Sequence, residues 1–199
     1  MGFKIVRLKN TLFLASQSSR RHDGLLEKGI PFTEIPNLLG KEPSYEAGES
    51  FSAYVMRLSY LKAAASKEGY RGCVVGMDTI VVFEDEVYGK PATMAEASQT
   101  LLRFSGGTQR VLSAVTLIDT INQIQRSMVE ENTVYFNDYS EEAVLSYCEQ
   151  FEVLDKAGGY GIQDCLGSLI SHYEGSFESI MGLPIKSLLQ ILKECDMIE

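Results

Sequence analysis

The stretch that decides the fold is Cys73-Val74-Val75-Gly76-Met77-Asp78-Thr79-Ile80-Val81-Val82-Phe83. It is the most apolar and most β-branched run of the chain, which is typical of a strand buried on both faces. We therefore expect the central strand of a sheet. Asp78 stands in its middle, and a buried carboxylate needs a partner. That partner is either a divalent metal ion, a water that the metal activates, or a structural arginine or lysine.

The sequence on either side of this stretch predicts an α/β protein with a mixed sheet. Further strands are expected over residues 11–15, 32–35, 109–119, 125–136 and 166–173. Helices are expected over residues 20–28, 51–67, 94–104, 141–149 and 185–195. The short connection between the two longest of these strands predicts an antiparallel pair. Residues 36–48 and 156–163 are expected to be loops because turn-forming residues dominate them.

Composition limits the class of protein. The chain has 199 residues, of which 45% are hydrophobic and 23% charged, so we expect one soluble, cooperatively folded domain. The net charge of -9 and a pI near 4.8 disfavour a standing nucleic-acid partner. No apolar run reaches the roughly 18 residues of a membrane span, so we expect a cytoplasmic protein without a membrane partner.

Cysteine and histidine usage bears on the chemistry. The four cysteines have no CxxC spacing, which predicts reduced structural thiols rather than a zinc site or a disulfide framework. Only His22 and His172 could support a histidine-centred mechanism. Carboxylate and metal chemistry is therefore favoured.

The first candidate binding segment is Ser16-Gln17-Ser18-Ser19-Arg20-Arg21, between a predicted strand and a predicted helix. A helix N-terminus offers unpaired N–H groups and a positive dipole end, and arginine presents a fork that matches phosphate oxygens. The segment therefore predicts a phosphate site. The alternative is an ordinary helix cap followed by two solvated arginines.

Two lysines are further candidates. Lys62 lies on the helix expected over residues 51–67. The helical spacing of apolar side chains predicts that the buried face of this helix is formed by Tyr54, Val55, Leu58, Leu61 and Ala65. Lys90 stands on a stiff turn between Gly89 and Pro91, which suits a fixed point charge. The alternative for both lysines is plain solvation.

The segment over residues 156–163 carries three glycines, which permit close approach by a ligand. Gln163 at its end could then read the edge of a nucleobase, although a plain glycine-rich turn is the alternative. Neither the P-loop nor the GxGxxG spacing is present in the chain.

The ordered set of motifs resembles the Maf family of nucleoside triphosphate pyrophosphatases over nearly the whole chain. Each motif is weak alone, and the specificity comes from their order. The motifs are Leu14-Ala15-Ser16-x-Ser18-x-Arg20-Arg21, Arg57-Leu58-x-x-x-Lys62-Ala63, Gly76-x-Asp78-Thr79, Gly89-Lys90-Pro91, Leu102-x-x-x-Ser105-Gly106, Asp155-Lys156-Ala157-Gly158-x-Tyr160-Gly161-Ile162-Gln163, Gly175-Ser176 and Gly182-Leu183-Pro184.

The resemblance implies a fold and a reaction. The fold is a single Maf-like domain over residues 1–199, with a mixed, elongated β-sheet and flanking helices that form two lobes around a central cleft, as in ITPase-like proteins. The reaction is hydrolysis of a nucleoside triphosphate between its α- and β-phosphates, with Mg²⁺, Mn²⁺ or Co²⁺ as the divalent cofactor. The substrate is the implied partner, and a homodimer is left open.

The resemblance also assigns roles to residues. Asp78 is the implied base that activates water, and Glu42 with Asp78 is implied to hold the metal. Four residues are implied to hold the triphosphate: Ser16, Arg21, Lys62 and Lys90. Three residues, Arg20, Thr79 and Gln163, match the branch of the family that acts on dTTP and UTP.

Two alternatives to the dTTP and UTP reading are a 7-methyl-GTP pyrophosphatase and a non-catalytic nucleotide-binding regulator of division or septum formation. The chain departs from the family pattern at Ser19, Met77, Gln109 and Asp164. Asp164 follows Gln163 where glycine is usual, so its carboxylate bears on which base is accepted.

Overall fold

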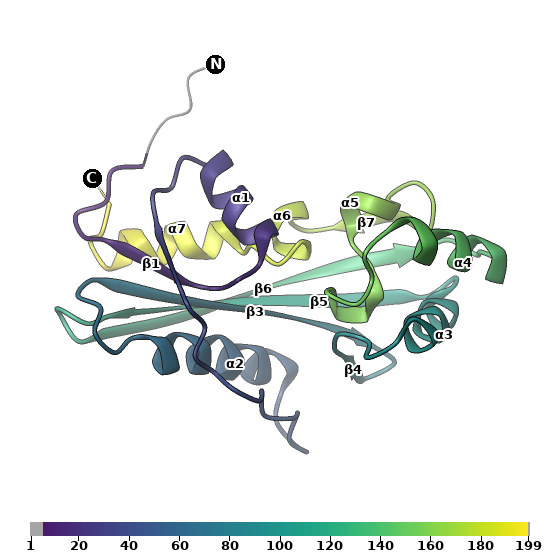
Figure 1. The fold of residues 1–199 in the computed structure, drawn as a ribbon, viewed down its shortest axis with the longest axis horizontal. Coiled ribbons are helices and arrows are strands. Elements are labelled where there is room, and N and C mark those ends of the chain that lie inside the picture. Colours follow the sequence, from purple (N-terminus) through teal and green to yellow (C-terminus); the bar gives the residue numbers. More distant parts are fainter. Residues whose placement is uncertain (1–5, 199) are drawn as a thin grey trace. The chain divides into compact units, whose positions relative to one another are not determined.

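The computed structural model of the chain is a mixed α/β protein with one seven-stranded sheet flanked by helices (Figure 1). The predicted fold class is thus confirmed. The structure describes residues 6–198, so residues 1–5 and 199 of the predicted domain lie outside the described residues.

The strands and helices agree with the predicted ones at most positions. The strands are β1 (Leu12–Ala15), β2 (Thr33–Ile35), β3 (Cys73–Phe83), β4 (Glu86–Tyr88), β5 (Thr108–Asp119), β6 (Ile124–Phe136) and β7 (Ile170–Glu174). The helices are α1 (Ser19–Glu27), α2 (Phe51–Ser66), α3 (Met94–Phe104), α4 (Glu141–Gln150), α5 (Ile162–Cys165), α6 (Phe177–Ile180) and α7 (Ile185–Glu194), with a 3₁₀ turn η1 (Ala157–Gly159).

Strand β3 lies inside the sheet, as its composition predicts. The strand order is β2-β1-β3-β5-β6-β7, and β4 pairs antiparallel with the end of β3. Strand β1 is parallel to both β2 and β3. Strands β5 and β6 are neighbours joined by residues 120–123, and this connection is too short for a parallel crossover, so they are antiparallel.

The chain divides into two compact units. The described residues of the first are 6–78, 113–130 and 182–198, and the second comprises Thr79–Leu112 and Glu131–Met181. Strands β3, β5 and β6 each supply residues to both units. Each unit has a hydrophobic core of its own.

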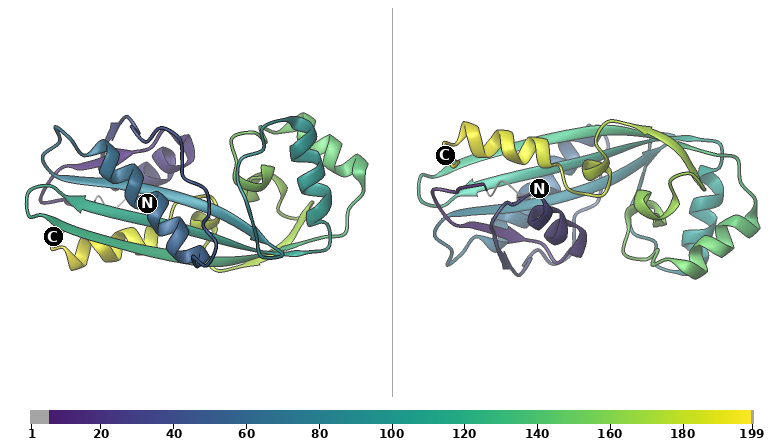
Figure 2. Two further views of the ribbon diagram at one scale, coloured as in Figure 1. Left: turned by 90° about the horizontal axis from the view of Figure 1, so that it is seen from below. Right: turned by 90° about the horizontal axis from the view of Figure 1, so that it is seen from above.

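In the first unit, helices cover the sheet on both faces, with α1 and α7 on one face and α2 on the other (Figures 1 and 2). Side chains of β3 alternate between these faces. Val75 and Met77 pack in the core with Leu25 of α1 and Leu188 of α7, whereas Val74 packs with Ala63 of α2. This alternation places Asp78 on the face that α2 covers.

The buried face of α2 agrees with the predicted one at Tyr54, Val55 and Leu58, but it differs toward the end of the helix. Leu61 and Ala65 are only half-buried, while small and polar side chains face the sheet. The buried members of this set are Ser59, Lys62, Ala63 and Ser66. Small side chains fit here because α2 and β3 approach so closely that a Cβ at Gly76 would meet the Ser59 carbonyl oxygen and the Ala63 nitrogen. The predicted pattern of apolar residues missed this, because it weighs hydrophobicity rather than volume.

In the second unit, aromatic side chains surround Phe104 at the end of α3, and α4 packs alongside. Two predictions here are wrong in detail. Gln163 lies in the one-turn helix α5 rather than in a loop, because the left-handed glycines Gly158 and Gly159 close a 3₁₀ turn before it. The last strand begins at Ile170 rather than at residue 166, because Gly167 turns the chain with a positive φ of 86°.

No helix within residues 6–198 is long and apolar enough to cross a membrane. The four cysteines are free thiols, and Cys73, Cys148 and Cys165 are buried.

The close approach at Gly76 can be tested by substitution. We expect Gly76→Ala to lower the free energy of unfolding by about 1–3 kcal/mol, because the added methyl group collides with backbone atoms of α2. The measurement is urea unfolding. Gly40→Ala is the matched control, since nothing lies within 4 Å of its added Cβ. Equal unfolding midpoints for the two variants would contradict the packing described for α2.

Candidate active site

The centre of the candidate site is a buried ammonium group shared by two carboxylates. Lys62 Nζ lies 2.7 Å from Asp78 Oδ1 and 2.9 Å from Glu42 Oε1. Asp78 and Lys62 are both buried, whereas the Glu42 side chain is half-exposed. Of the partners proposed for Asp78 from the sequence, the structure provides the lysine. The solvated alternative for Lys62 is therefore wrong.

Local geometry explains why Lys62 meets Asp78. Asp78 is two residues beyond Gly76 on the same face of β3, and Lys62 is three residues beyond Ser59 on the same face of α2. The close approach of Gly76 to Ser59 and Ala63 brings both side chains within hydrogen-bonding reach. Ser59 is fixed in turn by a buried hydrogen bond, 2.7 Å long, to Thr116 of β5.

A second group of predicted residues gathers at the start of α1. Arg21 donates from Nη1 to Ser16 Oγ at 3.2 Å and from Nε to the Gly182 carbonyl oxygen at 2.9 Å. The Ser16 hydroxyl also accepts from the Ser18 N–H at 3.2 Å. Ser18 occupies the N-cap position of α1 but makes no side-chain capping bond. The segment is thus organised around Arg21 rather than as an ordinary helix cap.

The charge of Arg21 is not fully compensated. Burial lowers the pKa of Arg21, and the positive charge of Arg20 adds to this effect. The negative charges of Asp78 and Glu42 act in the opposite direction. A desolvated guanidinium whose pKa stays lowered gains from an additional anion, and its planar fork suits a phosphate.

The loop that carries Glu42 is fastened to α2. Arg57 donates to both carboxylate oxygens of Glu49, at 2.8 and 2.6 Å, and to the Ser44 carbonyl oxygen at 3.2 Å. The side-chain hydrogen bond from Arg57 lowers the pKa of the Glu49 carboxyl group. The Tyr54 hydroxyl donates to the Pro43 carbonyl oxygen, next to Glu42. The sequence alone assigns Arg57 no role beyond its motif, because a pair eight residues apart across a loop leaves no periodic signal.

The remaining predicted residues belong to the second unit. Thr79 is half-buried on β3, and both Lys90 and Gln163 are exposed. The turn that carries Lys90 is joined to η1, which precedes Gln163, since the Gly158 N–H donates to the Gly89 carbonyl oxygen at 2.9 Å. Gly159 also packs near Pro91, because a Cβ on Gly159 would lie 3.7 Å from the proline ring.

The carboxylates of the site decide whether it could hold the predicted divalent cation. Within residues 6–198, no group of three or more His, Cys, Asp or Glu side chains could hold a metal ion by itself. Asp78 and Glu42 nevertheless both contact one ammonium nitrogen, so both carboxylates border the same small space. Two hard oxygen donors suit Mg²⁺, which commonly takes its other ligands from water and substrate phosphates. The residues fit the cation on these terms.

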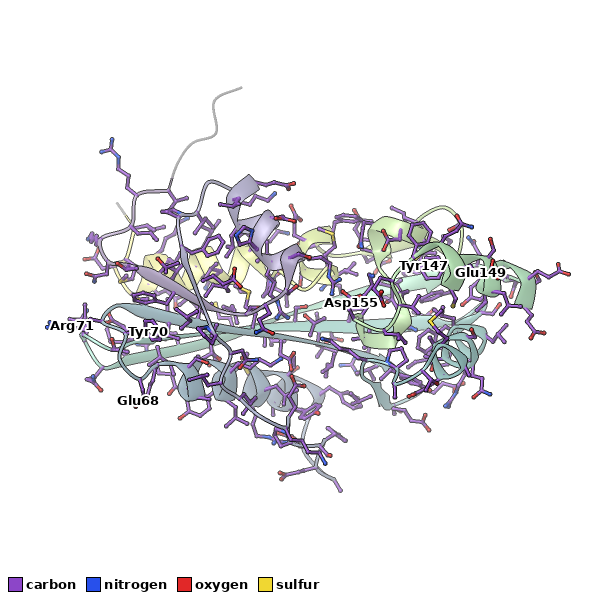
Figure 3. The ribbon with its side chains drawn as sticks, viewed as in Figure 1. Glu68, Tyr70, Arg71, Tyr147, Glu149 and Asp155 are labelled. Carbon is purple, nitrogen blue, oxygen red and sulfur yellow. The ribbon has the colours of Figure 1, made fainter. Side chains whose placement is uncertain are left out.

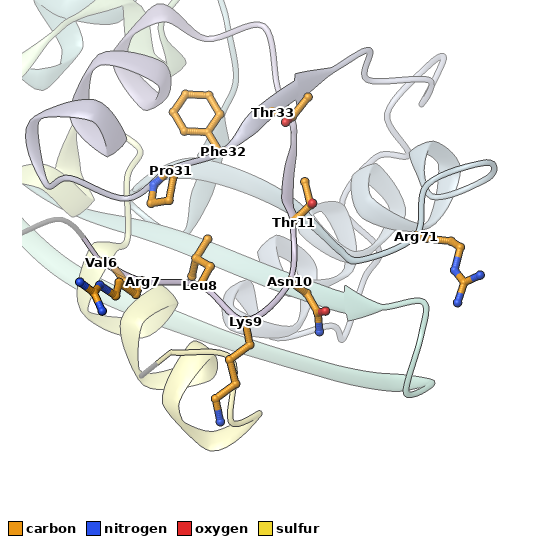
Figure 4. A pocket seen from close by; sticks show the side chains of 10 residues that line it. All are labelled: Val6, Arg7, Leu8, Lys9, Asn10, Thr11, Pro31, Phe32, Thr33 and Arg71. Atoms are coloured by element: carbon orange, nitrogen blue, oxygen red, sulfur yellow. The ribbon is translucent and has the colours of Figure 1, made fainter.

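Two hollows lie outside this cluster. One of about 780 Å³ is lined by residues 6–11, 31–33 and 71 (Figure 4). None of its residues is a predicted site residue, and its Lys9 is paired with Asp196 at 2.6 Å. The other, of about 260 Å³, borders the start of α1 between Ser18 and Glu34. The buried carboxylate and ammonium groups, rather than hollow volume, identify the candidate active site.

The fold and the site together define an α/β protein with a buried carboxylate–ammonium cluster beside an arginine suited to phosphate. A family model described as "Maf-like protein" matches residues 11–195. The chain therefore belongs to the Maf-like protein family, which confirms the resemblance seen in its motifs.

Individual relatives match along almost their whole length. A protein of Vibrio cholerae named "dTTP/UTP pyrophosphatase" is 38% identical over 91% of this chain and 96% of its own. A protein of the same name from Symbiobacterium thermophilum is 40% identical over 92% of this chain and 93% of its own. Another from Pseudoalteromonas translucida is 36% identical over 94% of this chain and 97% of its own. A solved Mycobacterium abscessus chain titled "Nucleoside-triphosphatase / dITP/XTP pyrophosphatase" is only distantly similar, at 13% identity and a TM-score of 0.39 over 63% of this chain and 74% of that one.

The shared ammonium group should matter for stability. We expect Lys62→Met to lower the free energy of unfolding by about 2–3 kcal/mol, because it leaves the buried Asp78 carboxylate without its partner. Lys90→Met, at an exposed position, should change it by less than about 0.5 kcal/mol. Chemical denaturation of both variants is the measurement. If Lys62→Met lowered the free energy of unfolding no more than Lys90→Met does, the result would contradict the pairing of Lys62 with Asp78.

Proposed function

We propose that this chain is a nucleoside triphosphate pyrophosphatase that hydrolyses dTTP and UTP to the monophosphate and pyrophosphate. The observation that carries the proposal is the cluster of Lys62, Asp78 and Glu42 beside Arg21, in a member of the Maf-like family. Relatives that carry the name dTTP/UTP pyrophosphatase along nearly the whole chain support it.

Phosphate binding is the first task. We assign it to Ser16, Arg21, Lys62 and Lys90. Arg21 suits this task because its Nε and Nη1 atoms are already fixed by Gly182 and Ser16, so Nη2 can meet a phosphate oxygen without further ordering. Lys62 balances two carboxylates in the free protein, and the triphosphate would offer its ammonium group further anionic oxygens. Fixed positive charges of this kind stabilise the charge that develops during phosphoryl transfer.

Activation of water is the second task, which we assign to Asp78. Its carboxylate is buried and accepts a hydrogen bond from Lys62, so it is held in one orientation. In that orientation it accepts the proton of the attacking water. Asp78 and Glu42 would hold Mg²⁺, which when bound lowers the pKa of water and offsets phosphate charge.

Base selection is the third task. We assign it to Arg20, Thr79 and Gln163, since these residues match the dTTP and UTP branch in the sequence. Gln163 is exposed and can offer its amide to a base edge. We also propose that residues 1–199 act as one domain, because β3 carries Asp78 and Thr79 as neighbours in the two compact units. The cytoplasmic location stays a prediction from the sequence.

The reaction can be tested with five nucleotides: dTTP, UTP, CTP, GTP and 7-methyl-GTP. With Mg²⁺ present, we expect pyrophosphate release, fastest from dTTP and UTP. Asp78→Asn should lower kcat by about 10²–10⁴-fold, because the amide cannot accept the proton of water. Asp85→Asn is the control, since Asp85 is an exposed carboxylate on a turn where asparagine also tolerates the positive φ of 59°.

Four outcomes would count against the proposal. Orthophosphate as the only product, or no turnover of any nucleotide, would refute the reaction. Preferential turnover of 7-methyl-GTP would refute the substrate. A fully active Asp78→Asn protein would refute the role of Asp78.

The cation dependence gives a separate test of Glu42. Chelation with EDTA should abolish pyrophosphate release, and added Mg²⁺ should restore it. Glu42→Gln should raise the Mg²⁺ concentration for half-maximal activity by about tenfold, because an amide is a weaker ligand than a carboxylate. Glu46→Gln, an exposed carboxylate in the same loop, is the control. An unchanged Mg²⁺ titration for Glu42→Gln would show that Glu42 does not hold the cation.

A further inference from the structure

We propose that Asp164 fixes the orientation of the Gln163 amide and thereby makes the site accept uracil and thymine in preference to cytosine. The inference rests on the proposed function and names a specificity determinant that the family pattern lacks, since the motif usually has glycine at this position.

The contact that carries the proposal joins the two side chains. Gln163 Nε2 donates to Asp164 Oδ2 at 2.9 Å. Both residues lie in the one-turn helix α5 of the second unit, and the Asp164 N–H donates to the Gly161 carbonyl oxygen at 2.9 Å. Gln163 is exposed, so its amide is accessible to a ligand while it is held by Asp164.

Gly161 makes room for this pair. A Cβ at Gly161 would lie 2.6 Å from Asp164 Oδ2 and would also collide with Gln163 Nε2. The amide and the carboxylate therefore lie directly over the glycine backbone. Gly161 leaves open the space that the pair occupies and is not needed for an unusual backbone angle, because its φ of -118° is open to any residue.

The support beneath the pair is rigid. The Gly161 N–H donates to the buried Tyr147 hydroxyl at 3.0 Å, and Tyr147 lies beside α5 in Figure 3. The Cys165 thiol donates to the Gly161 carbonyl oxygen at 3.2 Å, and Ile162 is buried in the core of the second unit. These contacts hold the backbone beneath the pair, so a change in which side of the amide faces outward has to come from rotation within the Gln163 side chain.

The chemistry of the contact selects one orientation of the amide. An ionised carboxylate only accepts hydrogen bonds, so it must face the NH₂ group of Gln163. Turning the amide over would place Oε1 against Asp164 Oδ2, two acceptors together. Asp164 therefore leaves Oε1 as the acceptor that Gln163 presents to a ligand.

An outward acceptor distinguishes the pyrimidines. Uracil and thymine carry a hydrogen-bond donor at N3, which Oε1 can accept. Cytosine carries an acceptor at N3, so the same contact would be repulsive, and a site built around a hydrogen bond rejects an analogue that cannot make it. With glycine at position 164, the amide could turn over and donate to cytosine N3. The carboxylate of Asp164 thus acts on the base through Gln163.

The test compares Asp164→Asn and Asp164→Gly with the unmodified protein. The isosteric asparagine can donate as well as accept, so it permits both amide orientations. We expect the ratio of kcat/KM for UTP to that for CTP to fall at least fivefold in both variants, mainly through a lower KM for CTP. The dissociation constants of α,β-imido-UTP and α,β-imido-CTP should change in the same ratio. Glu149→Gln, an exposed carboxylate elsewhere in the second unit, is the control and should leave both ratios unchanged.

The outcomes separate the two claims. If Asp164 had only a structural role, its substitution would weaken the binding of UTP and CTP equally. Unchanged UTP-to-CTP ratios in both variants would therefore overturn the inference, while the proposed function would stand. If the unmodified protein released no pyrophosphate from either nucleotide, the proposed function would fail. The two dissociation constants would still test Asp164 in that case, because they do not depend on turnover.

Discussion

The structure depends on one buried ammonium group that two carboxylates share. Lys62 can lie between Asp78 and Glu42 only because α2 approaches β3 closely at Gly76, where a side chain would strike the helix backbone. The same contact explains why the small residues Ser59 and Ala63 of α2 lie against β3 at this point. Packing and charge placement are therefore one constraint: the helix that closes the core on this face also carries the cation of the site.

This arrangement reconciles an acidic protein with an anionic substrate. The net charge is -9, yet Arg21 and Lys62 gather with Asp78 and Glu42 at the site, and Arg20 adds its positive charge beside Arg21. Burial lowers the pKa of Arg21, so a phosphate that enters relieves an electrostatic cost already present in the free protein. The loop that carries Glu42 is held by Arg57 and Tyr54, so this carboxylate is positioned before any ligand arrives.

Much of the fold could be predicted from the sequence, and the reasons are local. The strand over residues 73–83 and the helix over residues 94–104 were predicted to the residue, because their composition and spacing are unambiguous. The buried face of α2 was predicted correctly at Tyr54, Val55 and Leu58 but wrongly at Leu61 and Ala65, since close packing at Gly76 is decided by volume across two elements. The position of Gln163 in a helical turn was missed because two left-handed glycines reset the chain just before it.

The candidate site was predicted as a set of residues but not as a set of contacts. Lys62 and Asp78 are sixteen positions apart, and their pairing depends on the register of a helix against a strand. The shared ammonium is best tested directly by a crystal structure with Mg²⁺ and α,β-imido-dUTP. We expect phosphate oxygens within hydrogen-bonding distance of Lys62 Nζ and Arg21, with Mg²⁺ on Asp78. A nucleotide bound elsewhere, such as in the hollow of Figure 4, with Lys62 still paired only to its two carboxylates, would contradict it.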